Sequence, residues 1–173
     1  MREAKKVNEA WYAVQVMTGK ETEVRAKLEK LKLATMLPVQ RMPERRGGTW
    51  VMKPRMALPG YIFAEAAMTP ECYYAIKTVP GVMRLLGTDG PEAIPPEQLA
   101  IIALLTYEEN LIEVRGGRAA LGQVLSEAGA RIVSADMRQR RAKVEIRLLD
   151  GSHTATLGIP IDGEQRQMQE REG

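Results

Sequence analysis

The chain has almost none of the residues from which metal sites and disulfide frameworks are built. Its 173 residues include one cysteine, Cys72, and one histidine, His153. A disulfide within the chain needs two cysteines, and a zinc site usually takes three or four cysteine, histidine or carboxylate ligands. These scarcities exclude an internal disulfide and argue against a zinc site. We therefore expect no metal and no cofactor.

Long apolar runs are also missing. No run approaches the roughly 20 apolar residues that a helix needs to cross a membrane. The first ten residues, MREAKKVNEA, lack the apolar stretch of a secretory signal. Apolar and charged contents of 45% and 27% are typical of soluble globular proteins. We expect a reduced, cytoplasmic protein with no membrane partner, and nothing in the sequence demands more than a monomer.

Catalytic motifs are absent as well. The sequence has no Walker phosphate loop, no G-x-G-x-x-G and no H-E-x-x-H. His153 lies near Asp150 and Ser152 in DGSHTAT, but a triad requires its members to meet in space in defined roles. Cys72 lies within a predicted helix, where packing explains it better than nucleophilic chemistry. We therefore expect no catalytic residues and no enzyme.

The chain begins with a predicted strand and a predicted helix. WYAVQV, at 11–16, is short and rich in aromatic and β-branched residues, as buried strands are. Apolar residues then recur at helical spacing and predict a helix over 20–33. Thr18 and Glu21 have the spacing of a capping box, so we expect Thr18 to cap this helix.

Strands joined by turns are predicted over 34–66, with RRGG at 45–48 as a hairpin tip. A second helix follows over 69–79, with Thr69 as its cap. MRLLG has the pattern of a short strand, and IPPEQLAIIALLTY predicts a third helix over 94–107. This order predicts an α+β domain in which helices pack on a mostly antiparallel sheet.

The pattern changes after residue 107. A polar, glycine-bearing stretch comes first, and short apolar runs separated by turns follow, without a long helical period. Two RGG tripeptides, at 46–48 and 115–117, are interpreted as isolated turns. We divide the chain into an α+β domain (9–107), a linker (108–118), a small all-β domain (119–162) and a polar tail (163–173).

Positive charge is concentrated in DMRQRRAKVEIRLLDG, near the C-terminus. Between residues 131 and 147, six cations accompany two acids, and five of the six cations are arginine. In AKVEIRLL, apolar residues alternate with charged ones, so each kind occupies one face of a strand. We expect a hairpin whose tip and exposed face carry the candidate RNA-binding residues Arg131, Arg138, Arg140, Arg141, Lys143 and Arg147.

The chemistry of this hairpin favours a structured nucleic acid. Arginine forks bind phosphate bidentately, although a basic tip can also serve solubility alone. From residue 108 onward there is no Phe, Tyr or Trp, whereas single-strand binders stack bases on aromatic rings. A duplex or hairpin, recognised through phosphates and shape, suits such a surface better. About six phosphate contacts would make the binding strongly salt-dependent.

Several motifs, taken in order, resemble the N-terminal (NGN) domain of NusG-like transcription factors: WYAVQVMTGKE, ALPGYIFAE, VPGVMRLLG and IPPEQL. The second unit resembles their KOW domain, a small SH3-like β-barrel. VSADMRQRRAKVEIRLLDG is most similar to the LoaP branch of processive antiterminators. One segment departs from the pattern, because LSEAGAR replaces the glycine-rich first turn of KOW domains and keeps only Gly129. The resemblance covers about 11–161.

The resemblance implies a two-domain transcription elongation and antitermination factor. Its N-terminal domain would bind the clamp helices of the largest RNA polymerase subunit, and its KOW domain an RNA hairpin in the nascent leader, so that pausing and termination are suppressed. Two tethered contacts would raise each other's effective concentration. The residues that the resemblance assigns to an apolar polymerase-binding depression are Leu58, Tyr61, Phe63 and Leu85.

Two other functions stay open at this point. In the first, the chain is a general NusG-type elongation factor whose KOW domain binds a protein. In the second, it is an RNA-binding protein of ribosomal type without a polymerase contact. The basic hairpin argues against the first, and the LPGYIF and PGV elements against the second. Tyr61 and Phe63 also have a simpler interpretation, as core residues on one face of a strand.

Overall fold

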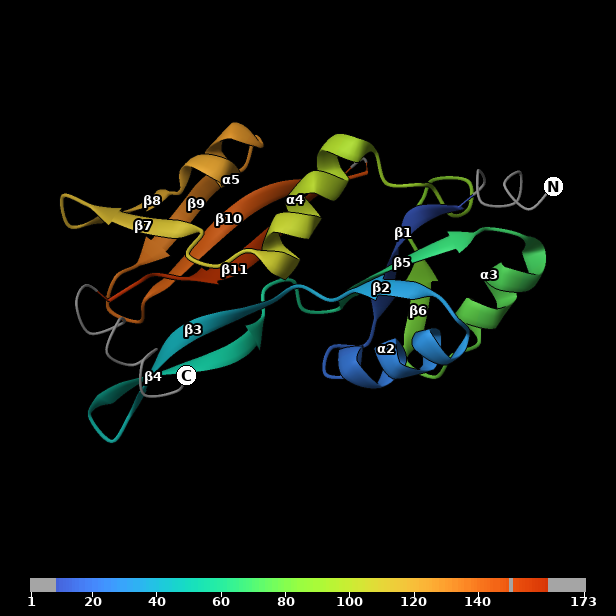
Figure 1. Cartoon of the computed structure of the whole chain (residues 1–173), viewed down its shortest axis with the longest axis horizontal. Helices are drawn as coiled ribbons and strands as arrows, with labels where there is room; N and C mark the ends of the chain where they lie inside the picture. The colour runs from blue at the N-terminus through green and yellow to red at the C-terminus, as the bar shows by residue number, and fades with distance from the viewer. Residues whose placement is uncertain (1–8, 150, 162–173) are drawn as a thin grey trace. The chain divides into compact units, whose positions relative to one another are not determined.

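A computed structural model describes residues 9–149 and 151–161. These residues form two compact units, whose helices and strands are labelled in Figure 1. The units are discontinuous in sequence, whereas the division predicted at residue 107 is a single cut. The first unit contains residues 9–37, 59–99 and 148–149, and the second contains residues 38–58, 100–147 and 151–161.

The first unit is built on a four-stranded sheet with the order β2-β5-β1-β6, in which every neighbouring pair is antiparallel. Helix α2 lies against β2 and β5, and helix α3 lies against β6 (Figure 1). This arrangement confirms the predicted α+β class with an antiparallel sheet. The elements are β1 (Glu9–Val16), α2 (Glu21–Lys30), β2 (Ala34–Met36), β5 (Tyr61–Ala67), α3 (Pro70–Lys77) and β6 (Val82–Leu85).

The predicted cap of α2 is wrong. Lys20 occupies the N-cap position, and no side chain caps the helix. The Glu21 carboxylate, which is buried, instead accepts hydrogen bonds from the backbone N–H groups of Gly19 at 2.8 Å and Gly60 at 2.7 Å. Because both bonds fasten the loop before α2 to the turn before β5, Glu21 serves tertiary structure rather than a capping box with Thr18.

The other helix predictions agree more closely with the structure. The Thr69 hydroxyl accepts a hydrogen bond from the Cys72 N–H at 3.1 Å, so it caps α3 as predicted. Burial raises the pKa of the Cys72 thiol, which fits a packing role. The third predicted helix is α4 (Pro96–Tyr107), and it buries Ile102 and Leu105.

The second unit contains the rest of the strands, residues 100–107 of α4 and one further short helix. Its strands form a three-stranded antiparallel sheet with the order β11-β10-β9 and two separate hairpins, β3–β4 and β7–β8. These sheets do not form one closed barrel within the described residues, so the SH3-like barrel stays a prediction. The elements are β3 (Val39–Arg46), β4 (Thr49–Met56), β7 (Ile112–Arg115), β8 (Arg118–Leu121), α5 (Gln123–Glu127), β9 (Arg131–Asp136), β10 (Arg141–Leu148) and β11 (Gly151–Gly158).

The stretch predicted as a linker folds into the β7–β8 hairpin. Its strands look polar in sequence because charged residues cover the exposed side, but Leu111 and Ile112 are buried. The following segment is not all-β either, because LSEAGAR continues α5 and then turns at Gly129, whose φ is 93°. The short run of apolar residues in this segment was not enough to distinguish a short helix from a strand.

Strand β10 follows the predicted alternation. Ala142, Val144 and Ile146 are buried, whereas Lys143 and Arg147 on the opposite face are exposed. The packing therefore directs the cations of this strand to solvent, as the sequence predicts.

Strands β3 and β11 approach each other at a glycine. A Cβ atom on Gly158 would lie 2.9 Å from the Cδ atom of Pro43 and 3.0 Å from the Cα atom of Met42. Real Cβ atoms essentially never approach as closely as 2.9 Å, and 3.0 Å is closer than nine in ten real Cβ contacts, so the close packing of β3 on β11 favours glycine at 158. The β3–β4 hairpin is thereby held beside the three-stranded sheet of its own unit.

In the part of the chain that the structure describes, no helix is long and apolar enough to cross a membrane. The same residues contain no group of three histidine, cysteine or acidic side chains placed to hold a metal ion.

Candidate nucleic-acid interface

The turn between β9 and β10 presents the first arginines of the basic segment. The Asp136 carboxylate accepts hydrogen bonds from the backbone N–H groups of Arg138 and Gln139, both at 3.0 Å. This is the usual way in which aspartate stabilises a tight turn. Arg140 completes the turn in the left-handed region, with φ 59°. The backbone is thus fixed while the side chain of Arg138 extends into solvent.

The tip of the β3–β4 hairpin lies beside this turn within the second unit. Gly47 and Gly48 form its two-residue connection, with φ 58° and 80°, as a tight hairpin turn requires. Arg45 and Trp50 are cross-strand partners next to the tip. The Arg45 guanidinium lies over the Trp50 ring, 4.9 Å from its centroid, in a cation–π contact.

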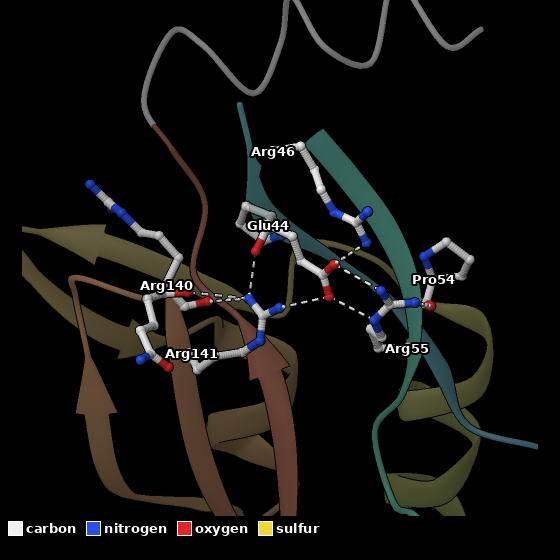
Figure 2. Close-up of polar contacts among 8 residues, drawn as sticks. Glu44, Arg46, Pro54, Arg55, Arg140 and Arg141 are labelled. Atoms are coloured by element: carbon white, nitrogen blue, oxygen red, sulfur yellow. Dashed lines mark hydrogen bonds and ion pairs between the residues drawn. The ribbon is translucent and has the colours of Figure 1, made fainter. Parts of the chain in front are cut away.

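Arg141 joins the turn to the hairpin (Figure 2). Its Nη1 donates to the carbonyl oxygen of Pro43 at 2.6 Å, and its Nη2 to the Oε2 atom of Glu44 at 3.3 Å. The same Nη1 also lies within hydrogen-bond distance of the carbonyl oxygens of Gln139 and Arg140. Burial lowers the pKa of this guanidinium, and the charge of Glu44 opposes that shift. Arg141 therefore holds the structure together rather than offering an open phosphate ligand.

Glu44 is surrounded by arginine. Its carboxylate accepts hydrogen bonds from Arg55, through Nε at 2.6 Å and Nη2 at 2.8 Å, and from Arg46 at 3.5 Å (Figure 2). The hydrogen bond from Arg55 is the main reason why the pKa of Glu44 lies below its ordinary value. With Arg141, three guanidinium groups surround one carboxylate, so the cluster keeps a positive balance.

The other predicted RNA-binding residues fall into two groups. Arg131 is paired with Glu145, at 2.6 Å, and this hydrogen bond lowers the pKa of Glu145. Arg140 donates from Nη1 to the carbonyl oxygen of Pro160 at 3.0 Å. The side chains of the other three, Arg138, Lys143 and Arg147, are exposed and form no hydrogen bond or ion pair with residues 9–149 or 151–161. The charge of Arg147 adds to that of Arg131 in lowering the pKa of Glu145.

Trp50 and Arg45 are the members of this surface that sequence reasoning missed. A cavity of about 430 Å³ separates the hairpin tip from the β9–β10 turn, and its lining includes Arg45, Trp50, Arg138 and Gln139. The C-terminal residues lack aromatic side chains, but the fold supplies one from residue 50. The basic-aromatic pattern of ERRGGTW was a usable signal, although nothing in it indicated which later residues it would meet.

Three of the residues assigned to polymerase binding, Tyr61, Phe63 and Leu85, lie in the first unit and do not share one face of its sheet. On the central strand β1, Val14 pairs with Leu85, whereas Ala13 pairs with Phe63. Directly opposed residues point to the same face, so Leu85 lies on the opposite face of the sheet from Phe63 and Tyr61. In the second unit, Leu58 is buried.

The four residues assigned to polymerase binding also differ in how exposed their side chains are. Phe63 is fully buried and Leu85 nearly so, which makes them core residues in this structure. Tyr61 is half-buried, and its face also carries Gln15, which accepts a hydrogen bond from Arg84 at 2.8 Å. The polymerase contact stays a prediction, with Tyr61 as its most accessible member.

Comparison with known proteins explains the architecture of the first half. The model of a protein family described as NusG, transcription termination factor, matches residues 9–103, which are more than half of the 173 residues. The chain belongs to the NusG family. The basic hairpin of β9 and β10 lies outside the matched range, so family membership does not by itself explain those arginines.

Individual relatives agree with this assignment. The transcription termination/antitermination protein NusG of Halalkalibacterium halodurans is 29% identical over 119 residues, which cover 60% of this chain and 67% of that protein. NusG of Staphylococcus aureus is 27% identical over 118 residues, covering 60% of this chain and 65% of that protein. The match thus spans about two thirds of each relative. Both relatives are described as transcription termination/antitermination proteins.

A solved structure described as showing domain interaction in Thermotoga maritima NusG has the same overall fold. It matches 89% of this chain and 96% of that chain, with a TM-score of 0.54 and 20% sequence identity. The likeness therefore extends through the fold of the C-terminal strands. NusG family membership makes this chain a transcription termination/antitermination factor, whereas its place in the LoaP branch stays a prediction.

Proposed function

We propose that this chain is a specialised antiterminator of the LoaP type, which binds a structured leader RNA through its basic C-terminal hairpin and RNA polymerase through its N-terminal domain. The two contacts are joined in one chain, so each raises the effective concentration of the other. An RNA hairpin that emerges from the polymerase would recruit the factor, which then suppresses pausing and termination.

One observation carries the RNA half of this proposal. Arg138, Lys143 and Arg147 are exposed on one turn and one strand face, and no described carboxylate forms an ion pair with them. Glu145, the acid between two of them on β10, is already held by Arg131. Because Arg131 neutralises Glu145, the exposed face of β10 and the β9–β10 turn keep a net positive charge. Such a surface fits the regularly spaced phosphates of a folded RNA.

The polymerase half rests on family membership and on the N-terminal sheet. The predicted contact residues are Leu58, Tyr61, Phe63 and Leu85, of which Tyr61 is the most accessible. The partner we propose is the pair of clamp helices of the largest polymerase subunit. A Tyr61→Ala variant tests this contact: it should weaken binding to core RNA polymerase without changing RNA affinity.

The RNA contact is tested by titrating labelled RNA with the full chain at two salt concentrations. The probes are an RNA hairpin and a single strand of matched length, followed by fluorescence anisotropy. Replacing Arg138, Lys143 and Arg147 by alanine should weaken hairpin binding at least tenfold. It should also reduce the slope of log K against log salt by about 2 to 3, because three phosphate contacts are lost.

The control variant removes the same charge elsewhere, with Lys20, Lys27 and Lys30 of the first unit replaced by alanine. It should bind the hairpin within about twofold of the native chain, because it lowers the net charge equally but leaves every cation of the β9–β10 hairpin in place. Equal weakening by both triple variants, or equal affinity for hairpin and single strand, would show a nonspecific surface.

One observation supports the alternative of a general elongation factor with a protein partner. Strand β9 is at the edge of its three-stranded sheet, and Val133 on it is 54% exposed. An exposed strand edge with an apolar residue is a usual protein-docking feature. If the basic triple variant keeps its RNA affinity while Val133→Asp abolishes antitermination, this alternative replaces the RNA-binding proposal.

A further inference from the structure

The cavity beside Trp50 combines three properties that phosphate binding alone does not need. It has an aromatic ring, because half-buried Trp50 lines it and packs against Met52 and Ile161. It has exposed arginines, Arg45 and Arg138. Its volume of about 430 Å³ lies within the usual range for a small-molecule site, so one nucleotide fits within it.

The charges around the cavity favour an anionic occupant. Glu44 is its acidic lining residue, but Arg55 and Arg141 already bind that carboxylate. Arg45 and Arg138 form no ion pair with a carboxylate of the described residues. A phosphate in the cavity would therefore meet two available guanidinium groups, and the acid would not repel it strongly.

The stacking surface is already present. The guanidinium carbon of Arg45 lies 4.9 Å from the centroid of the Trp50 ring, and its Nη1 atom donates a hydrogen bond to the carbonyl oxygen of Gly48 at 3.2 Å. Bases stack on tryptophan rings and on guanidinium planes alike. Gln139 lines the same cavity, and its side-chain amide carries both a donor and an acceptor for a base edge.

We propose that this cavity binds one unpaired nucleotide of the RNA, whose base stacks on the Trp50–Arg45 pair while its phosphate contacts Arg138. This inference rests on the proposed RNA binding and adds to it a single-stranded element. The stem is held by phosphate contacts along β10, and one loop or bulge base enters the cavity. The C-terminal unit thereby obtains from the β3–β4 hairpin the aromatic platform that its own residues lack.

The test uses the full-length chain with Trp11→Phe, which leaves Trp50 as the only tryptophan. Its fluorescence is followed during titration with an RNA hairpin, with the same hairpin carrying abasic loop positions, and with the stem as a blunt duplex. The intact loop should quench Trp50, whereas the abasic hairpin and the duplex should bind without quenching. AMP, CMP, GMP and UMP at millimolar concentration serve as free-nucleotide probes.

Two substitutions in the native chain separate stacking from packing. Trp50→Phe keeps an aromatic face and should bind the hairpin within about threefold. Trp50→Leu keeps an apolar side chain against Met52 and Ile161 but has no ring, so hairpin affinity should fall about fivefold to a hundredfold. Far-UV circular dichroism, together with equal affinity of Trp50→Leu and the native chain for the blunt duplex, shows that the fold is intact.

Each outcome decides between the two proposals. If anisotropy shows hairpin binding but Trp50 is not quenched and Trp50→Leu binds equally well, the nucleotide cavity is wrong and the RNA-binding proposal stands. If the hairpin does not bind at all, the RNA-binding proposal is wrong. In that case the free nucleotides decide the cavity: quenching of Trp50 supports it, and no quenching overturns it.

Discussion

The second unit contains two hairpins whose tips are almost identical in local structure. Both follow arginine with two glycines: Gly47 and Gly48 have φ of 58° and 80°, and Gly116 and Gly117 have φ of 57° and 76°. Both connect antiparallel strands through the same kind of tight turn. The side chains around the two tips differ, and so do the functions we assign to them.

The β3–β4 tip carries an aromatic ring and lies next to a cavity, whereas the β7–β8 hairpin contains no aromatic residue. At β7–β8, Arg115 is paired with Glu113 at 2.8 Å and also reaches the carbonyl oxygen of Leu121. At β3–β4, the equivalent residue Arg46 also pairs with a glutamate two residues earlier, Glu44, at 3.5 Å. The difference is the preceding residue, Arg45, which lies over Trp50 and has no carboxylate partner among the described residues. The same turn motif is therefore a connection in one place and part of a candidate binding site in the other.

The largest difference between the two hairpins is expected when the packing that holds the β3–β4 hairpin against β11 is disrupted. Gly158→Val places a branched side chain against Pro43 and Met42, so it should destabilise the second unit by about 1–3 kcal/mol. Hydrogen exchange should show lost protection in β3 and β4 and unchanged protection in β7. Thr154→Val, at an exposed position of the same strand, should be close to neutral. An equal loss of protection in both hairpins would contradict the inference that Gly158 stabilises the β3–β4 hairpin alone.

Charge reversal should affect RNA binding at one tip only. Arg45→Glu with Arg138→Glu places acids at the cavity and should reduce affinity for an RNA hairpin at least tenfold, because attraction to phosphate becomes repulsion. Arg115→Glu with Arg118→Glu makes the same change in net charge at the other tip and should weaken binding less than threefold. Anisotropy titrations at one fixed salt concentration measure both. Similar losses would mean that only net charge matters.

Single glycine substitutions should show that the two turns are equivalent in stability. Gly48→Ala and Gly117→Ala each force a residue with a Cβ into positive φ, and neither Cβ would meet another atom within 4 Å. Each should therefore cost about 1–2 kcal/mol through backbone strain alone, as measured by urea unfolding. The Gly48 variant should also alter Trp50 fluorescence. A cost that differs by more than about 1 kcal/mol would show that the turns are not locally equivalent.

The smallest predicted effect concerns pH. Arginine contacts lower the pKa of Glu44 in the folded chain. The resulting stabilisation is fully present above the ordinary glutamate pKa of about 4.3 and is lost as pH falls through the lowered value. Glu44→Gln should be destabilised by about 1 kcal/mol or less at pH 7. Thermal unfolding should show this difference shrinking below pH 4, and a constant difference would assign the effect to packing.

Local patterns predicted most of the elements. Alternation placed the cations of β10 on its exposed face, and Thr69 with Pro70 predicted the start of α3. Thr18 shows where this reasoning stops. Its spacing to Glu21 satisfied the capping rule, but the carboxylate had a better use in binding the backbone of Gly60, 39 residues away. A rule based on near neighbours cannot include a competing partner that only the tertiary fold supplies.

The candidate interface was predictable only in part for the same reason. The sequence identified the basic segment, and the structure then divided its cations into bonded and available ones. Arg141 is bonded because Pro43 and Glu44 meet it in the folded chain, nearly a hundred residues from its own position. Trp50 was missed because its role depends on the same long-range approach of β3 to the C-terminal strands.

The discontinuity of the second unit has a consequence for building chimaeras between related proteins. Residues 38–58 belong with residues 100–147 and 151–161, although a separate strand-helix segment lies between them in sequence. If only the C-terminal part were exchanged, the β9–β10 turn of another protein would have to pack against Pro43 and Glu44 of this chain. Met52 would also lose its contact with Ile161. A chimaera that is to keep the RNA preference of this chain must therefore contain both segments of the second unit, residues 38–58 and the residues from 100 onward.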